Sequence, residues 1–331
     1  LAVIIAFVVE DFAGYWMHRL NHRVNIFWNR HIIHHSSEDF NLSCALRQSI
    51  SNTIKFSAIF MIPAALLGVP PSIFAVLGPL HLFMQFWYHT QLIGKLGLLE
   101  YILVTPSHHR VHHAINPEYI DKNYSQILII WDKLFGTFQP EIDSVKPVYG
   151  TLKPMKTWNP VIINFKHLWH LIKDAWHAKR IIDKIRIWFM PTGWRPKDLE
   201  KKFPLEIIND PKKQIKYETK NSSILIGWSW VQLVITNILM FHFFISLSTF
   251  NSTLDYLYAF ILILNIFSFT SLLDQRRYSI ISESIKLILV CSLFYYQNFS
   301  WYGLEGLFAY AVGIYFITSF FLHIFFQNEK N

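Results

Sequence analysis

Long apolar stretches and polar blocks alternate along the chain. Residues 1–17 are almost wholly apolar, with Glu10 and Asp11 as the charged exceptions, and residues 54–94 form a second apolar stretch that proline and glycine interrupt near its middle. A helix needs about 20 apolar residues to cross the hydrocarbon core of a bilayer. The first stretch therefore predicts the end of a membrane helix that starts before Leu1, and the second predicts a hairpin of two membrane helices.

Four further apolar stretches fill the C-terminal region. Each has roughly the length of one membrane helix, and short polar turns separate them at residues 223–247, 255–273, 280–297 and 301–326. No internal repeat or low-complexity segment interrupts this order. The pattern predicts an all-α, polytopic helical membrane protein whose residues 222–331 form a transmembrane region of about four spans.

Polar residues concentrate in two blocks, residues 18–53 and 95–221. Within the second block, residues 158–189 interleave Trp, Ile, Leu and Phe with Lys, Arg and His. This pattern is typical of helices that lie on a membrane surface, and equally of an amphipathic helix packed on its own domain. We therefore expect an N-terminal domain of residues 1–150, which includes the hairpin, and an amphipathic helical segment of residues 151–221.

Composition supports a membrane protein. Of the 331 residues, 52% are hydrophobic and 16% charged, whereas soluble domains carry roughly 25% charged residues. If both polar blocks lie on one side of the membrane, the predicted spans place the dense Lys and Arg clusters, including Arg276 and Arg277, on that same side. The positive-inside rule then makes that side cytoplasmic. Anionic head groups then explain the net charge of +8. No basic run interleaved with aromatics marks a nucleic-acid-binding domain, so no nucleic-acid partner is expected.

Nine of the sixteen histidines fall into short motifs. They form one HxxxH, two HxxHH and one single position, at His18 and His22, at His31, His34 and His35, at His109, His112 and His113, and at His89. On a helix, positions i, i+3 and i+4 share one face. We therefore expect each motif to direct two or three imidazoles at a common point.

Convergent imidazoles predict metal ligands. Neutral imidazole binds Zn, Cu, Fe and Ni, and eight or nine such ligands exceed what one ion needs, so two metals are implied. Cys44 and Cys291 stand apart and form no CxxC pair, so thiolate ligands are not expected. The predicted architecture is thus a membrane bundle with a cytoplasmic, His-lined helical cap that holds a dimetal site.

Further polar residues near the motifs are candidates for supporting roles. Carboxylates that accept ring N–H bonds would orient the ligands; helix capping or a solvated loop explains the same residues equally well. The candidates are Asp11, Glu38, Asp39, Asp121 and Asp132.

Three more residues lie close to the ligand motifs in sequence. Gln85 lies four residues before His89 and is a candidate for completing a coordination sphere. For His81 we favour a buried histidine with a hydrogen-bond partner over a ligand. His108 lies four residues before His112, which leaves its role as an additional ligand open. No catalytic residue beyond the metal ligands is singled out.

The motifs HRLNH, HIIHH and SHHRVHH, in this order and at these intervals, resemble the fatty acid hydroxylase and sterol desaturase superfamily. The resemblance is closest to the alkylglycerol monooxygenases, and it rests on residues 34–49 (HHSSEDFNLSCALRQS), 85–90 (QFWYHT), 105–113 (TPSHHRVHH) and 121–138 (DKNYSQILIIWDKLFGTF). The long membrane region after residue 221 is also similar to that group.

This resemblance implies a membrane-bound non-haem diiron oxygenase with the nine histidines as its ligands. It implies O2 as co-substrate, a lipid substrate and hydroxylation of the carbon next to an ether oxygen, after which the product collapses to an aldehyde and glycerol. It also implies an electron donor, which in the alkylglycerol monooxygenases is tetrahydrobiopterin. One position departs from that group: an acidic residue follows their HxxxH motif, whereas Arg23 stands here.

Three alternatives remain open from the residues. A sterol or fatty acid hydroxylase or desaturase would use the same ligands. A metal transporter would hold its site near the bilayer midplane, whereas these motifs flank the predicted spans. A bis-histidine haem protein would need isolated histidines on facing spans. The residues therefore favour an O2-dependent oxidoreductase that acts on a lipid.

Overall fold

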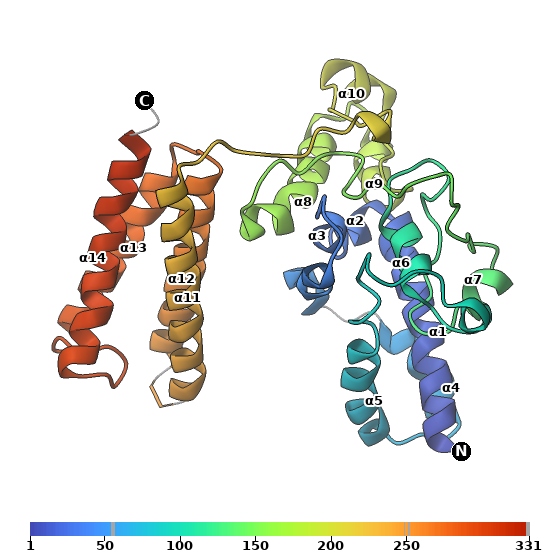
Figure 1. Cartoon of the computed structure of the whole chain (residues 1–331), viewed down its shortest axis with the longest axis horizontal. Helices are drawn as coiled ribbons and strands as arrows, with labels where there is room; N and C mark the ends of the chain where they lie inside the picture. The colour runs from blue at the N-terminus through green and yellow to red at the C-terminus, as the bar shows by residue number, and fades with distance from the viewer. Residues whose placement is uncertain (54–56, 248, 251, 329–331) are drawn as a thin grey trace. The chain divides into compact units, whose positions relative to one another are not determined.

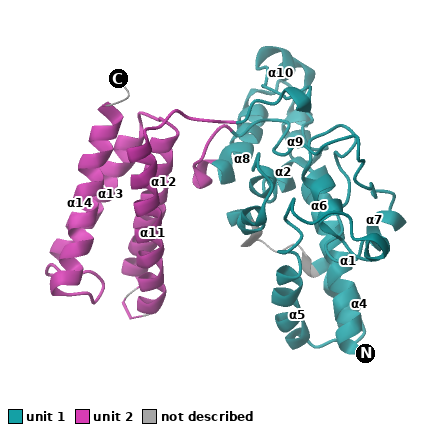
Figure 2. Cartoon of the chain, viewed as in Figure 1, with its two compact units in different colours: residues 1–155, 163–216 teal, residues 156–162, 217–331 magenta. Residues whose placement is uncertain are grey.

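The computed structural model describes residues 1–53, 57–247, 249–250 and 252–328, and within them the regular structure is helical, with three isolated β-bridges (Figure 1). The predicted all-α fold is confirmed. The chain divides into two compact units: unit 1 contains residues 1–155 and 163–216, and unit 2 contains residues 156–162 and 217–331 (Figure 2). Each unit has its own buried apolar residues.

Unit 2 is built on four long helices. They are α11 (Ser223–Ser246), α12 (Ser252–Leu273), α13 (Ser279–Tyr296) and α14 (Gly306–Asn328). Each is long and apolar enough to cross a membrane, and consecutive helices pack against each other. The chain is therefore a multi-pass membrane protein. The last helix starts at Gly306 instead of the predicted 301, because Trp301 and Leu304 exchange two backbone hydrogen bonds of 2.9 Å in a turn.

Charged residues are buried among these four helices. The Lys286 ammonium lies 2.8 Å from Glu283 Oε1 and donates to Asn265 Oδ1 at 2.7 Å. Ser319 donates to Glu283 Oε1 at 2.7 Å, and His323 Nδ1 lies 3.7 Å from Glu283 Oε2. Both partners of the ion pair are fully buried.

Unit 1 combines two helices of 18 residues or more with many short ones. The longest is α1 (Ala2–Arg23). The other α-helices are α2 (Asn25–Trp28), α3 (Ile32–His35), α4 (Ile62–Leu66), α5 (Pro71–Phe83), α6 (Pro106–His113), α7 (Ile130–Leu134), α8 (Pro160–His177), α9 (Ile181–Phe189) and α10 (Lys197–Lys202). The 3-10 helices are η1 (Leu42–Leu46), η2 (Ile50–Thr53), η3 (Ser57–Met61), η4 (Gly97–Tyr101) and η5 (Pro211–Lys213). Residues 160–162, the first turn of α8, belong to unit 2.

The region of the predicted hairpin packs against α1. Ala64, Val69 and Leu77 form a buried cluster with Ala6 of α1. At 13 residues, α5 is about 20 Å long, whereas the hydrocarbon core is about 30 Å thick. Part of the predicted hairpin, residues 54–56, lies outside the described residues. Two full spans at residues 54–94 therefore stay a prediction, as do the predicted domain boundaries.

The amphipathic segment forms α8 and α9. Ile163 and Leu171 of α8 and Ile187 of α9 are buried, and Leu171 and Ile187 pack into one cluster. Exposed aromatic residues at helical spacing, Phe165, Trp169 and Trp176, occupy another face of α8. The segment thus packs on its own unit through one face and keeps a second apolar face exposed.

Candidate metal centre

Four segments of unit 1 supply the nine histidines of the predicted site. His18 and His22 lie one turn apart near the end of α1, and His89 follows the turn after α5. The HxxHH motifs lie at α3 and on α6, where Pro106 at the first turn starts the helix. His31 precedes α3 with φ −126°, so this motif is a turn and a short helix instead of one regular helix.

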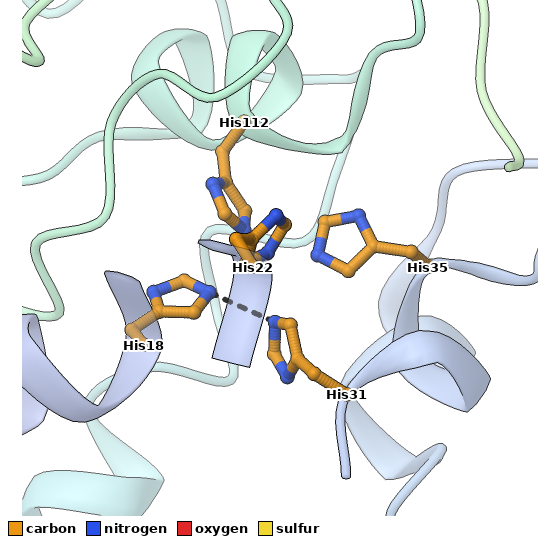
Figure 3. Close-up of side chains that lie close together, drawn as sticks. All are labelled: His18, His22, His31, His35 and His112. Atoms are coloured by element: carbon orange, nitrogen blue, oxygen red, sulfur yellow. Dashed lines mark hydrogen bonds between the residues drawn. The ribbon is translucent and has the colours of Figure 1, made fainter. Parts of the chain in front are cut away.

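Five of the nine form the first group. The side chains of His18, His22, His31, His35 and His112 converge from α1, the α3 region and α6 (Figure 3). One nitrogen from each ring lies within 4.8 Å of all the others. The shortest approach joins His18 Nε2 and His31 Nε2 at 2.8 Å.

The other four, His34, His89, His109 and His113, form the second group within the same limit of 4.8 Å. His89 Nε2 lies 3.2 Å from His34 Nε2 and 2.8 Å from His109 Nε2. His113 Nε2 lies 3.0 Å from His109 Nε2. All four side chains are buried.

Each HxxHH motif divides between the two groups. The i and i+4 histidines of the first motif, His31 and His35, join the five-histidine group, while the i+3 residue His34 joins the other. In the second motif the i+3 residue, His112, is the one that belongs to the five-histidine group. Adjacent residues point about 100° apart on a helix. Each motif therefore directs two imidazoles at one site, as expected, and its third imidazole at the adjoining site.

Backbone carbonyls fix the tautomers of four rings. The Nδ1 atoms of His18 and His112 lie 2.7 and 3.0 Å from the carbonyl oxygens of Tyr124 and Lys122. His34 Nδ1 lies 3.0 Å from the Cys44 oxygen and His89 Nδ1 lies 3.0 Å from the Gln85 oxygen. A carbonyl oxygen only accepts, so each Nδ1 carries the hydrogen and each neutral ring presents a lone pair at Nε2.

Several Nε2 atoms of the two groups have no donor to meet. His34 Nε2 and His89 Nε2 face each other as two acceptors, and the buried Nε2 atoms of His22, His35 and His112 have no hydrogen-bond partner. Buried, unpaired polar atoms are costly, and a shared cation removes the cost. Metal–nitrogen bonds of about 2.1 Å would place neighbouring nitrogens about 3 Å apart, close to the observed 2.8–3.2 Å. The donor set therefore fits two metal ions.

Burial keeps the rings neutral. It lowers the pKa of His18 and of His89 to about 4, because a charged imidazolium loses its hydration inside the protein. The pKa values of the other seven fall well below the ordinary value, first through burial and then through neighbouring imidazoles: His22, His31, His34, His35, His109, His112 and His113. Neutral rings are the form that binds metal.

The candidate residue Asp11 lies apart from the nine rings. It is fully buried, and its carboxylate accepts from His81 Nε2 at 3.0 Å, from the Ile127 and Leu128 amides, and from Trp131 Nε1 at 2.8 Å. Asp11 therefore ties α1 to α5, to the segment before α7 and to α7 itself (Ile130–Leu134). His81 is the buried partner of this carboxylate.

Gln85 acts through its backbone. Its side-chain amide nitrogen lies 3.1 Å from His81 Nδ1 and 3.4 Å from Gln126 Oε1, away from both histidine groups. Its carbonyl oxygen is the acceptor for His89. The amide side chain is thus placed beside His81, while the main chain orients a candidate ligand.

Asp39, Asp121 and His108 also lie outside the two groups. Asp39 pairs with Lys216, and Asp121 pairs with Arg23 at 2.5 Å. His108 is buried beside Phe138, with its ring centroid at 5.5 Å, and neither group includes it. Among the described residues, these three are therefore separate from the convergent nitrogens.

Asp132 supports the candidate centre indirectly, through a loop that orients one of the histidines. Its carboxylate accepts from the backbone amides of Tyr124 and Ser125 at 2.8 Å and from Thr137 at 2.6 Å. This fixes the loop whose Tyr124 carbonyl holds His18. Sequence reasoning considered Asp132 but missed the orienting carbonyls, because every residue has a carbonyl group and no residue type marks one.

Comparison with known proteins identifies the same region of the chain. Residues 3–137, which contain all nine histidines, match the model of the fatty acid hydroxylase family. This part of the chain is therefore similar to the fatty acid hydroxylase family.

The chain is also homologous to alkylglycerol monooxygenases. It is 40% identical over 289 residues to that of Homo sapiens and 41% identical over 301 residues to that of Danio rerio. These alignments cover 87% of this chain and 64% of each relative, so the chain spans less than two thirds of their length. The ornithine lipid hydroxylase OlsE of Rhizobium tropici is 33% identical over 136 residues, 41% of each chain. No solved structure matches. The predicted resemblance is confirmed.

Proposed function

We propose that this protein is an O2-dependent diiron monooxygenase that hydroxylates an ether lipid of the alkylglycerol class. The observation that carries the proposal is the pair of adjoining histidine groups, which contain buried Nε2 atoms without a hydrogen-bond partner. The homology to alkylglycerol monooxygenases supports the choice of reaction and substrate.

In this proposal each histidine group holds one iron ion. The five-histidine group consists of His18, His22, His31, His35 and His112, and the four-histidine group of His34, His89, His109 and His113. Imidazole also suits zinc and copper, so iron follows from the proposed oxygen chemistry. When bound, the two ions would supply the activation of O2 for attack on an unactivated C–H bond.

The proposed reaction is R–CH2–O–R′ + O2 + 2 e− + 2 H+ → R–CH(OH)–O–R′ + H2O. A C–H bond breaks and a C–O bond forms at the carbon next to the ether oxygen, while the second oxygen atom leaves as water. The hydroxyl proton of the hemiacetal then passes to the ether oxygen as that C–O bond breaks. The products are a fatty aldehyde and a glycerol with a free hydroxyl.

The chain's own residues orient the ligands and exclude water. The carbonyls of Tyr124 and Cys44 hold His18 and His34 in the tautomer that presents Nε2. The buried rings of Phe40 and Tyr88 lie 5.0 and 4.2 Å from those of His113 and His109, between centroids. Such apolar walls keep water from the reacting carbon.

We propose that the centre works at the cytoplasmic face. The turn between α12 and α13 carries Arg276 and Arg277, and residues 247–252 and 297–305 at the opposite ends of the spans contain no Lys or Arg. The positive-inside rule favours the cytoplasm for the arginine end. Unit 1 continues into α11 at that same end, since Asn221 donates to the Leu273 oxygen at 3.0 Å.

The two electrons come from a donor that we propose to be a reduced pterin such as tetrahydrobiopterin. This rests on the homology alone. Arg23, which directly follows the HxxxH motif, pairs with Asp121, so a positive charge is neutralised next to the motif. Replacing tetrahydrobiopterin by other reductants in the assay separates the donor from the reaction.

The test is metal content and O2-dependent turnover of the detergent-purified protein on a labelled alkylglycerol, with tetrahydrobiopterin. We expect two irons per chain and fatty aldehyde, both diminished in His34→Ala. His177→Ala removes an exposed histidine and serves as the matched control that keeps both.

Two irons without aldehyde would refute the ether substrate and direct the search to sterols, fatty acids and the lipid class named for the Rhizobium relative. A chain that binds no iron under conditions that load it with zinc would contradict the diiron centre. Transport of metal across vesicles without turnover would support the transporter alternative.

A further inference from the structure

A cavity of about 520 Å³ opens at the arginine end of unit 2. Gln275, Arg276 and Arg277 of the turn between α12 and α13 line it together with Ile280, Ile324 and Gln327 of α13 and α14. These residues are all separate from the nine histidines. The cavity is therefore a second candidate site, on the unit that carries the four membrane helices.

The cavity is lined by positively charged side chains and by apolar side chains. Arg276 and Arg277 are exposed and supply two positive charges, while Ile280 and Ile324 supply apolar wall. Gln327 donates its amide to the Arg277 carbonyl at 2.8 Å, and its Oε1 is buried without a hydrogen-bond partner. The lining thus offers guanidinium donors and hydrocarbon contact to one ligand.

Three helix ends meet at the cavity. Ser279 is the first residue of α13, a helix of 18 residues, and the partial positive charge of a helix N-terminus attracts anions. Ile280, which lines the cavity, belongs to this first turn. The C-termini of α12 and α14 lie at the same cavity and carry partial negative charge, so the positive potential comes from the two arginines.

The cavity lies at the level of lipid head groups. It is formed where α12 ends and α13 begins, at the ends of two candidate membrane spans. Tyr278 in the same turn is 42% exposed, and Trp158 of unit 2 is 47% exposed and bonds Thr219 just before α11. Aromatic residues are enriched at the membrane–water interface, so these side chains mark the same depth.

We propose that this cavity binds the phosphate group of an anionic phospholipid. Arginine forms forked hydrogen bonds to phosphate. Ile280 and Ile324 contact the first carbons of the acyl chains. Basic pockets between membrane helices on the cytoplasmic side are known binding places for anionic head groups.

The experiment uses native mass spectrometry of the detergent-purified full chain, titrated with phosphatidylglycerol or with phosphatidylcholine of the same acyl chains. The Arg276→Gln/Arg277→Gln variant removes the two charges. Lys212→Gln/Lys213→Gln removes two exposed charges from unit 1 and is the matched control. Ile280→Trp fills the cavity without a change of charge and tests the same site independently.

We expect one phosphatidylglycerol per chain, bound about 30-fold more weakly when both arginines are replaced and unchanged in the lysine control. Ile280→Trp should also weaken binding. An excess of inorganic phosphate distinguishes two sources: displacement of the lipid assigns the site to free phosphate, and retention assigns it to phospholipid. Equal affinity for both lipids, or full affinity in Arg276→Gln/Arg277→Gln, would overturn the proposal.

Discussion

Each unit buries a polar cluster, and the two clusters are satisfied in opposite ways. In unit 2 the charges of Glu283 and Lys286 neutralise each other at 2.8 Å, Asn265 accepts from Lys286, and Ser319 donates to Glu283 Oε1, while Glu283 Oε2 has no hydrogen-bond partner. In unit 1 nine neutral imidazoles face one another, and the Nε2 atoms of residues such as His22 and His35 have no partner.

The difference separates a structural cluster from a binding site. A buried ion pair whose two charges neutralise each other needs no ion from outside. Lone pairs that face lone pairs need a cation to make their burial favourable. The same degree of burial therefore predicts a role in bundle specificity for the Lys286 cluster and a metal centre for the histidines.

The largest effect is expected from loss of one ligand. His109→Ala should remove metal from the four-histidine group and lower turnover by more than about 100-fold, beyond the 10- to 100-fold that changes around the ligands cause. His108→Ala is the matched control, since His108 is buried next to it on α6 but lies outside both groups. Metal per chain is measured by plasma mass spectrometry. Equal metal loss in both variants would contradict the assignment of ligands.

The second-largest effect is expected from breaking the Glu283–Lys286 ion pair of unit 2. Lys286→Met leaves the Glu283 carboxylate buried without its partner and should destabilise the protein by about 3–5 kcal/mol. Replacing both, in Glu283→Leu/Lys286→Met, should recover most of this loss. Unfolding in mixed micelles measures both changes. A double variant as unstable as the single one would show that the cluster does more than neutralise charge.

A smaller effect is expected from the support of the ligand loop. Asp132→Asn replaces one acceptor of the Tyr124 and Ser125 amides by a donor, and we expect a 10- to 100-fold loss of metal affinity. Asp143→Asn changes an exposed carboxylate that pairs with Lys95 and should leave the affinity unchanged. Competition with a chelator gives both affinities; an effect of equal size at Asp143 would refute the role of the loop.

The smallest effect is expected at the Arg23–Asp121 pair. The two side chains are 52% and 33% exposed, and solvent-exposed ion pairs contribute about 1 kcal/mol or less. Arg23→Gln should therefore change the free energy of unfolding by less than about 1 kcal/mol, and less at high salt. Denaturant titration at two salt concentrations checks this. A large change would mean that Arg23 supports the centre directly.

The sequence by itself determined the helical membrane class and which nine histidines converge. Hydrophobic length specifies a spanning helix without reference to the rest of the chain, so α11, α12 and α13 agree with the predicted stretches. Likewise, the spacing within HxxHH restricts which rings share a face.

Only the tertiary structure decided how these histidines divide. His34 and His35 are neighbours in sequence but belong to different groups. Their side chains point in different directions, and the fold places partner histidines in both directions, so only the fold decides which group each ring joins. The orienting groups were decided in the same way. Carbonyls of Tyr124 and Lys122 hold ring nitrogens where carboxylates were expected, since a backbone acceptor is present at every residue and only the fold selects the one that is used.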